Sequence, residues 1–260
     1  MAKTMISDLD TQKLKKYYKN RKPFEYVVID NFWDKEVAEK LQNEISSFVL
    51  KGQEVSVYDN ALEKKITCNH YDRFPKTVYQ AFSYLNSRSF VKIISEITGV
   101  EEIITDIGLH GGGLHIHPNQ GRLNVHKDYS IHPKLRKERR FNVIIYMTPE
   151  WDIKWGGDLE LWSHNEKTNR PLECVESISN KFNRAILFDT TQNSWHGLPG
   201  EIQMPPGIKR QSMAVYYLTE PKSNTDSREK ALFAPTKDQE NDNEVLELIK
   251  KRANLNKTSS

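Results

Sequence analysis

Residues 103 to 218 carry short hydrophobic runs separated by glycine, proline and asparagine. The runs are rich in β-branched and aromatic residues, and several alternate apolar with polar positions, as strands with one buried face do. About eight such strands with turns between them predict a sandwich or barrel, and a double-sheet jelly roll (a double-stranded β-helix) fits their spacing. The predicted strands are 103–107, 114–117, 122–128, 141–147, 158–162, 185–189, 194–197 and 211–218.

The first hundred residues have a different hydrophobic pattern, in which the helical period prevails. A strand-like segment at 24–32 precedes a helix for which Asp34 is a suitable N-cap. Pro75 suits the first turn of a second helix, and Ser89 caps a third. Residues 51–69 lack a period and predict a loop with short extended pieces. The residues expected on the buried helix faces are Val37, Ala38, Leu41, Ile45, Phe48, Val49, Val78, Phe82, Leu85, Ile93, Ile94 and Ile97.

These two hydrophobic patterns predict a single domain with two flanking segments. The domain spans residues 24–220, in which helices within 34–99 support and cover a jelly roll at 103–218. A polar extension, 1–23, precedes it, and a polar tail with a short amphipathic helix, 221–260, follows it. The tail helix either packs on the domain or contacts a second subunit, so a monomer and a homodimer both stay open.

Composition and charge exclude few function classes. Hydrophobic residues make up 37% of the chain, enough for a core, and charged residues make up 28%. The 38 basic residues nearly balance the 35 acidic ones, for a net charge of +3. A dedicated nucleic-acid binder shows a concentrated basic excess, so no nucleic-acid partner is expected. Two basic runs, 13–22 and 134–140, are interpreted as solvated faces, with substrate docking as the alternative.

The sequence shows no sign of export or of membrane insertion. Cys68 and Cys174 stand far apart without CxxC spacing, so reduced thiols are expected rather than disulfides. No apolar run approaches the roughly 20 residues that span a bilayer. Residues 1–10 lack the apolar segment of a signal peptide. We therefore expect a cytoplasmic protein with no membrane partner.

A His-x-Asp pair, His126 and Asp128, is the first candidate for chemistry. Residues two apart in a strand point the same way, so the two side chains can hold one metal ion from one sheet face. Arg122 and Asn124 share that predicted face and are candidate substrate contacts. Alone the pair is a weak signal, because the chain has eight histidines and a surface histidine beside an unrelated aspartate gives the same pattern.

A distal histidine, His196, strengthens this signal because intervening strands can return it to the same site. Two imidazoles and one carboxylate make the facial triad of a non-heme Fe(II) oxygenase. Arg210 opens a predicted strand, and a buried arginine requires a partner. A dicarboxylate supplies one through two parallel hydrogen bonds. His115 and His117 form another potential chelating pair without an evident third ligand, and we expect them at a cavity mouth or on the surface.

The order His-x-Asp, distal histidine, arginine resembles the 2-oxoglutarate- and Fe(II)-dependent dioxygenases, and more narrowly their prolyl 4-hydroxylase-like branch. The likeness covers about residues 24 to 220. It implies a double-stranded β-helix core covered by N-terminal helices. The blocks that carry it are 122–129, 142–147, 155–161, 183–189 and 196–210.

The resemblance implies that His126, Asp128 and His196 hold Fe(II), with ascorbate maintaining the metal. It implies a reaction in which O₂ and 2-oxoglutarate yield succinate, CO₂ and a hydroxylated product. Related halogenases lack a carboxylate at the position of Asp128, so its presence favours hydroxylation.

The cosubstrate roles also come from the resemblance. Arg210 is expected to bind the distal carboxylate of 2-oxoglutarate, with Lys209 as the fallback because the histidine-to-arginine spacing is long. Tyr146 matches a tyrosine that contacts the same carboxylate, although a core tyrosine bonded to backbone explains it equally well. Ser212 is expected to assist the arginine.

The substrate stays open at this point. It is either a prolyl or other residue of a protein, or a small metabolite or sugar. The candidate substrate contacts are Arg122, Asn124, Tyr129 and Trp162. The alternative from another class is a non-catalytic jelly-roll module that binds a metal or a carbohydrate, which would not need Arg210 and Tyr146 in one pocket with the triad.

Overall fold

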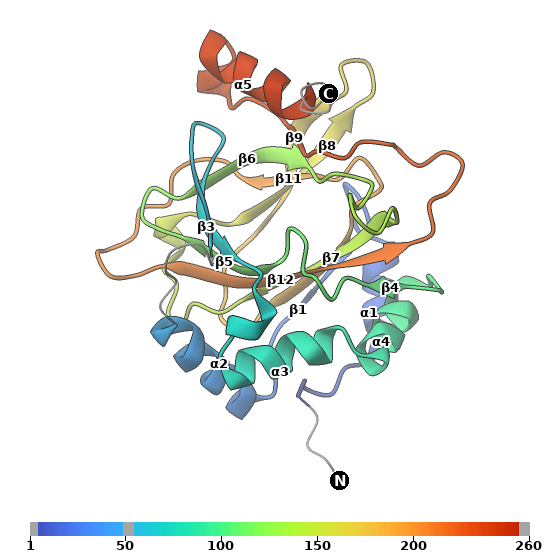
Figure 1. Cartoon of the computed structure of the whole chain (residues 1–260). Helices are drawn as coiled ribbons and strands as arrows, with labels where there is room; N and C mark the ends of the chain where they lie inside the picture. The colour runs from blue at the N-terminus through green and yellow to red at the C-terminus, as the bar shows by residue number, and fades with distance from the viewer. Residues whose placement is uncertain (1–4, 49–54, 255–260) are drawn as a thin grey trace.

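The computed structural model describes residues 5–48 and 55–254, and in them thirteen strands form one strongly curled sheet. Every strand pairing in it is antiparallel. The sheet curls into two layers, with β1, β7 and β12 in one and β6, β8 and β11 in the other (Figure 1), which makes the fold the expected double-stranded β-helix. In order across the sheet the strands are β1 (Tyr26–Ile29), β10 (Ala185–Asp189), β7 (Glu138–Tyr146), β12 (Arg210–Thr219), β5 (Gly113–His117), β3 (Glu63–Cys68), β6 (Arg122–Lys127), β11 (Trp195–Leu198), β8 (Leu159–Asn165) and β9 (Arg170–Ile178).

Each of the eight predicted strands has a counterpart, but four further strands carry no clear pattern. The region 51–69, predicted as a loop with short extended pieces, contains a regular hairpin of β2 (Ser56–Asp59) and β3. It was missed because the charged residues Glu63 and Lys65 of β3 face the interior cavity, where a strand does not need an apolar face. The edge strand β9 is largely exposed and therefore lacks apolar alternation. The fourth is the short edge strand β13 (Leu232–Phe233), which pairs with β6, whereas the short β4 (Ile104–Thr105), which pairs with β12, is the counterpart of the predicted strand 103–107.

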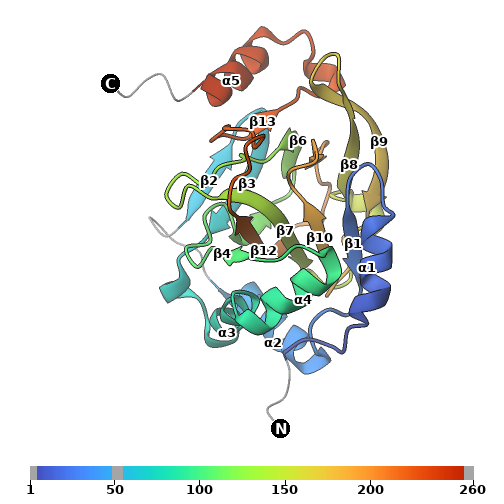
Figure 2. The same cartoon turned by 90° about the vertical axis from the view of Figure 1, so that its right-hand side faces the viewer.

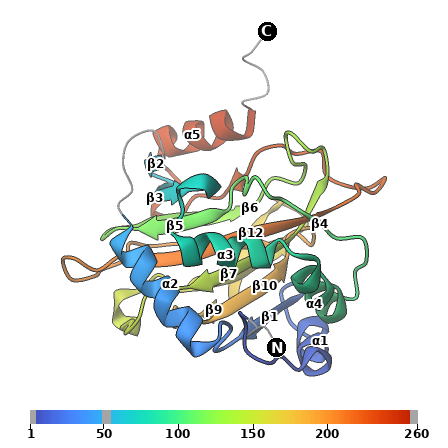
Figure 3. The ribbon, with the colours of Figure 1, turned by 60° about the horizontal axis from the view of Figure 1, so that its bottom comes forward.

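Helices cover the outer face of the layer that contains β7 and β12 (Figure 3). Asp34 caps the second helix as predicted, because its carboxylate accepts the Glu36 N–H. The fourth helix is capped by Ser87, whose hydroxyl accepts the Phe90 N–H, so the prediction of Ser89 was wrong by two residues. None of the described helices is long and apolar enough to cross a membrane. The helices are α1 (Thr11–Lys19), α2 (Lys35–Ser47), α3 (Lys76–Leu85), α4 (Arg88–Thr98) and α5 (Asn243–Asn254), with 3₁₀ turns at Tyr71–Arg73, Ile153–Trp155 and Lys237–Gln239.

Strand β7 separates the main hydrophobic core from the interior of the β-helix. Phe141 and Ile145 pack toward the helices, whereas the adjacent residues Asn142 and Ile144 line the interior cavity. This is the period-two alternation of a strand with two different faces. On the helix side most of the predicted residues are buried, while Val49 lies outside the described residues. Those below 2% exposure are Ala38, Leu41, Ile45, Val78, Phe82, Leu85, Ile94 and Ile97.

The C-terminal segment folds back over the β6 side of the sheet, where α5 lies above β13 (Figure 2). In β13, Phe233 pairs with His126 of β6. Helix α5 buries Val245 against Leu62 and Phe233 in a small separate cluster. The tail helix therefore packs on the domain, which was one of its two predicted placements. The proposed domain boundaries stay a prediction.

Candidate active site

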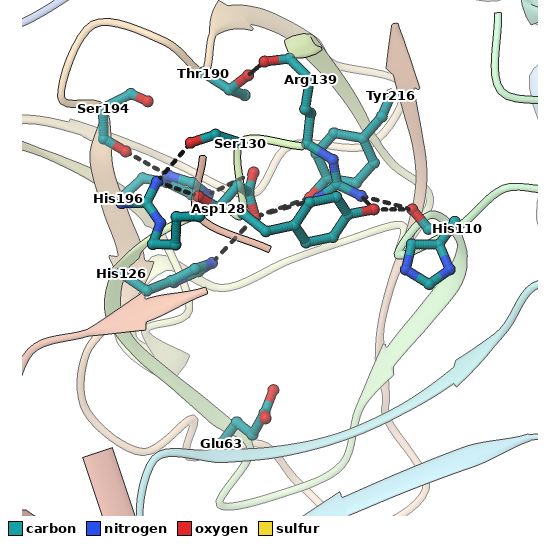
Figure 4. A network of polar contacts seen from close by, with 12 residues as sticks. Glu63, His110, His126, Asp128, Ser130, Arg139, Thr190, Ser194, His196 and Tyr216 are labelled. Carbon is teal, nitrogen blue, oxygen red and sulfur yellow. Dashed lines mark hydrogen bonds and ion pairs between the residues drawn. The ribbon is translucent and has the colours of Figure 1, made fainter. Parts of the chain in front are cut away.

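The structure brings His126, Asp128 and His196 to one point inside the β-helix (Figure 4). The two histidines are directly paired residues of β6 and β11, and Asp128 follows the end of β6. Their ligand atoms all lie within 4.8 Å of one another. The Nε2 atoms of His126 and His196 are 3.7 and 3.8 Å from the two carboxylate oxygens of Asp128. Adjacent strands thus place two imidazoles and a carboxylate as one buried donor set.

Backbone carbonyls fix the orientation of both imidazoles. The Nδ1 atoms of His126 and His196 lie 2.9 Å from the carbonyl oxygens of Asn124 and Ser194. In each case Nδ1–H donates to the carbonyl, which leaves the Nε2 lone pair directed at the shared point, as metal-binding histidines require. Burial, reinforced by the charge of His126, lowers the pKa of His196 to about 4. The ring is therefore neutral and available as a ligand at physiological pH.

Asp128 is held through one of its two oxygens. Its Oδ1 accepts from the Tyr216 hydroxyl at 3.3 Å and lies 3.7 Å from Nη1 of Arg139. The guanidinium carbon of Arg139 lies 3.4 Å from the ring centres of both Tyr129 and Tyr216, and its Nη2 donates to the carbonyl of His110. Figure 4 shows this cation beside the ring of Tyr216. The other oxygen, Oδ2, is buried without a hydrogen-bond partner among the described residues, so it suits a metal ion.

The ionisation of Asp128 fits this role. Burial alone would raise the pKa of the carboxyl, but the adjacent His126 and His196 rings and the charge of Arg139 hold that pKa well below its usual range. Asp128 is therefore a carboxylate that can bind a cation. Two imidazoles and one carboxylate on one side of an open cavity are the ligand set of non-heme Fe(II) oxygenases, so the residues present fit that metal.

A β-bulge explains why two predicted substrate contacts lie elsewhere. The pairing of β6 with β11 matches His126 to His196 but Leu123 to Leu198, so β6 has one extra residue in this interval. The alternation shifts, and Leu123 lines the cavity instead of Arg122 or Asn124. The prediction that Arg122 and Asn124 share the metal-facing side was therefore wrong.

Both of these side chains bond other parts of the chain. Arg122 donates to Glu201 and to the carbonyl of Asn60. The Asn124 amide donates to the carbonyl of Ala234 at 3.1 Å and to Oε1 of Gln239 at 2.6 Å. Asn124 thus secures the C-terminal segment rather than a substrate.

Gly197 permits the close approach of the two ligand strands. A Cβ atom at this position would lie 2.8 Å from the Leu123 carbonyl oxygen and from backbone atoms of Val125. Gly197→Ala is therefore expected to push β11 from β6 and weaken metal binding by about 10-fold or more, as other disturbed ligand supports do. Equilibrium dialysis with Mn²⁺ measures this.

The matched control is Gly108→Ala, whose Cβ would meet only the Asp106 carboxylate, at 3.4 Å. Its affinity should stay at the wild-type value. Equal affinities of both variants would contradict the role assigned to Gly197.

Three adjacent strands build a second, cationic end of the cavity. Ser212 of β12 pairs with Tyr146 of β7 and with His115 of β5, and Arg210 pairs with His117. Paired residues point to the same sheet face, so all five side chains face inward. Arg210 is 3% exposed and donates through Nε to the Gly157 carbonyl at 2.9 Å. Its guanidinium carbon lies 4.9 Å from the ring centre of Tyr146.

Several polar atoms at this end are buried and unpartnered among the described residues. They include the Tyr146 hydroxyl, both ring nitrogens of His117 and Nε2 of His115. Burial raises the pKa of Tyr146 to about 12, so the hydroxyl keeps its proton and can donate. Burial and then the charge of Lys65 lower the pKa of His115 to about 3, so that ring is neutral. A buried arginine beside unpartnered donors requires an anion, and a carboxylate matches it.

The remaining predictions divide between the cavity and the surface. Tyr129 lines the cavity. Trp162 does not, because it packs with Trp195 and Val125 on the outer side of β11, so its prediction as a rim residue was wrong. Lys209, the fallback for Arg210, is exposed.

Arg139 was missed altogether. It lies in the run 134–140 that was interpreted as solvated, yet it is only 2% exposed. In β7 the pairing matches Phe141 to Tyr217 but Arg139 to Leu218, a register shift that turns Arg139 toward the cavity. The only sequence signal is that it precedes Asn142, Ile144 and Tyr146 in the same strand.

Residues 112–218 match the 2OG-Fe(II) oxygenase superfamily. Solved structures with a similar fold include a Trichoplax adhaerens prolyl hydroxylase in complex with a hypoxia-inducible-factor peptide fragment (20% identity, TM-score 0.52, covering 80% of this chain and 90% of that one). A Pseudomonas putida prolyl-4-hydroxylase is 11% identical with a TM-score of 0.55, covering 80% of this chain and 100% of that one. The carbocyclase SnoK of nogalamycin biosynthesis is 10% identical with a TM-score of 0.56, covering 92% of each chain.

At these identities the structural similarities show a shared fold. The β-helix and the His-x-Asp and distal histidine triad define a non-heme Fe(II) oxygenase fold and site. Residues 112–218, which contain the triad and Arg210, are a segment of the 2OG-Fe(II) oxygenase superfamily.

Proposed function

We propose that the chain is an Fe(II)- and 2-oxoglutarate-dependent hydroxylase that converts an unactivated C–H of its substrate to C–OH. The observation that carries the proposal is that one cavity contains both the triad and the buried Arg210. His126, Asp128 and His196 would hold the metal on one side and leave its other side open. Arg210 would hold the distal carboxylate of 2-oxoglutarate.

The residues around these groups orient the reactants and exclude water. When bound, Fe(II) supplies the redox chemistry by which O₂ and 2-oxoglutarate become succinate, CO₂ and the hydroxyl group of the product. The protonated Tyr146 hydroxyl and Ser212 lie beside Arg210 and would complete the carboxylate site. Asp128 occupies the third ligand position with a carboxylate, which favours transfer of a hydroxyl group over that of a halide.

The proposal predicts slow turnover of 2-oxoglutarate even before a substrate is known. Purified protein with Fe(II), ascorbate and 2-oxoglutarate should release succinate, and removal of the metal with a chelator should reduce the release to the buffer background. Re-addition of Fe(II), but not of Zn²⁺, should restore it, because Zn²⁺ has no redox chemistry. Succinate is measured by mass spectrometry.

Succinate release that is equal with and without the metal would favour the non-catalytic binding module.

The substrate classes of this proposal are a prolyl or other residue of a protein and a small metabolite or sugar. The cytoplasmic location, the need for ascorbate and the monomeric or dimeric state stay predictions.

A further inference from the structure

The C-terminal segment contacts the metal ligands although it lies outside the part of the chain that matches the superfamily. The match covers residues 112–218, whereas β13 and α5 lie within residues 232–254. The connection from β12 to β13, residues 220–231, has neither helix nor strand and is mostly exposed. The segment is therefore held at the site by its own contacts, and these reach both residues of the His-x-Asp pair.

Phe233 lies against the first of these ligands through strand pairing. It is the partner of His126 in the ladder between β13 and β6, and paired residues point to the same sheet face. Its ring stacks on the His126 imidazole, with centroids 5.1 Å apart and planes at 22°, a favourable arrangement for two aromatic rings. The next residue, Ala234, donates its N–H to the Val125 carbonyl at 2.8 Å. Phe233 thus restricts the rotation of the imidazole, which the Asn124 carbonyl holds at Nδ1 alone.

Arg228 holds the backbone of the other ligand. Asp128 lies one residue past the end of β6, and none of the described strands pairs with it. The Nη2 of Arg228 donates to the Asp128 carbonyl at 2.7 Å and to the Ser130 hydroxyl at 3.1 Å. In return the N–H groups of Ser130 and Ile131 donate to the Arg228 carbonyl. These reciprocal bonds fix the stretch of chain that carries the carboxylate.

The docking of the C-terminal segment depends on a small apolar cluster that is separate from the main core. Its buried members are Leu62, Phe233 and Val245. Regions that bury little apolar surface open locally at a lower free energy than the whole domain. The segment can therefore detach while the β-helix stays folded, and the two ligands then lose their supports. A metal ion held by the supported ligands favours the docked state, because coupling between two such equilibria is reciprocal.

We propose, on the basis of the metal site in the proposed function, that Phe233 and Arg228 are positioning residues for its ligands. Phe233 orients the His126 imidazole, and Arg228 fixes the backbone of Asp128. The docked C-terminal segment thereby raises the affinity for the metal, and the bound metal keeps the segment docked. The matched segment of the chain supplies the three ligands, while the C-terminal segment completes their support.

Two substitutions separate the stacked ring of Phe233 from its packing. Phe233→Leu keeps an apolar side chain in the cluster but removes the ring, whereas Phe233→Tyr keeps the ring. Phe233→Leu should weaken Mn²⁺ binding about 10-fold in equilibrium dialysis, as lost supports of metal ligands do. Phe233→Tyr should stay close to the wild-type affinity. Wild-type affinity in Phe233→Leu, or an equal loss in both variants, overturns the role of the ring.

Arg228→Met tests the second support, because it removes both donors and keeps an apolar stem. Its affinity for Mn²⁺ should also fall about 10-fold. Asp226→Asn is the matched control. The Asp226 carboxylate is 54% exposed and pairs with Nη1 of Arg228 at 3.1 Å, whereas Nη2 reaches the Asp128 carbonyl. The control should keep the wild-type affinity, and the same affinity in Arg228→Met overturns its assignment.

Limited proteolysis of the full-length protein measures the reciprocal effect of metal on the segment. Trypsin cleaves after lysine, and Lys230 is exposed directly before β13. Because cleavage follows the population of the opened state, saturating Mn²⁺ should slow it about 10-fold in wild type. The protection should be smaller in Phe233→Leu. Cleavage after Lys167, in the exposed turn between β8 and β9, should not change. Equal cleavage after Lys230 with and without Mn²⁺ overturns the coupling.

The wild-type protein separates this inference from the proposed function. Wild type that binds Mn²⁺ and releases succinate with Fe(II), while Phe233→Leu and Arg228→Met bind Mn²⁺ equally tightly, leaves the proposed function intact and overturns the inference. Wild type that binds no Mn²⁺ overturns the metal site and the inference together.

Discussion

Asp128→Ala is expected to abolish 2-oxoglutarate turnover and to weaken Fe(II) binding by more than the roughly 10–100-fold that loss of a residue supporting a metal ligand costs. The variant removes the only carboxylate of the metal cluster found among the described residues. It also leaves the guanidinium of Arg139 buried without its anionic neighbour, which adds an unpaired charge to the site. His126→Ala should lose turnover in the same way, since the cluster then keeps one imidazole.

The measurements are metal content after dialysis against Fe(II) under anaerobic conditions and succinate release by mass spectrometry. Asp72→Ala is the matched control, because its carboxylate is 77% exposed and distant from the cluster in the chain. It should keep wild-type metal content and turnover. Asp128→Ala protein that binds Fe(II) as tightly as wild type would refute the assignment of this ligand.

Most of the fold could be predicted because the strands of the β-helix have two different faces. In β10 and β12 every residue is buried, and apolar runs between turn residues predicted both strands within one residue. The hairpin of β2 and β3 gave no such signal. Its inward residues Glu63 and Lys65 are charged and line the cavity, so the pattern of an apolar face is absent.

The errors at the site have a common physical origin in register shifts. A period of two predicts which residues share a sheet face only while the ladder is regular. The extra residue of β6 moves Leu123 into the cavity in place of Asn124, and the shift in β7 does the same for Arg139. His126 lies beyond the shift in β6, next to Asp128, so their relation could be predicted from spacing alone. Residues on the far side of each shift could not.

The C-terminal contribution had no sequence signal for a different reason. Phe233 reaches His126 through the pairing of β13 with β6, a contact between segments more than one hundred residues apart. Local periodicity carries no information about such a contact. The tail could be described as polar with a helix, whereas its place over the metal site follows only from the folded chain.

Arg210→Ala is expected to raise the 2-oxoglutarate concentration required for half-maximal turnover about 10- to 100-fold, since a hydrogen bond to a charged group is worth roughly 1.5–3 kcal/mol. Arg210 is 3% exposed, so water cannot replace the lost donors and the distal carboxylate stays unpaired in the cavity. Fe(II) content should stay near wild type, because no metal ligand contacts the guanidinium in the described structure. The 2-oxoglutarate requirement of Arg210→Lys should fall between those of wild type and Arg210→Ala, because lysine keeps the charge but loses the paired donors.

The adjacent Lys209 provides the matched control. Lys209→Ala removes a basic side chain one residue away that is exposed, so the 2-oxoglutarate requirement should not change. Steady-state succinate release against 2-oxoglutarate concentration measures both variants, with metal content recorded in parallel. A larger effect of Lys209→Ala than of Arg210→Ala would move the cosubstrate site to the exposed lysine. A joint loss of Fe(II) and of 2-oxoglutarate affinity in Arg210→Ala would instead mean that the arginine supports the metal ligands, since a residue that grips only the distal carboxylate leaves the triad of β6 and β11 intact.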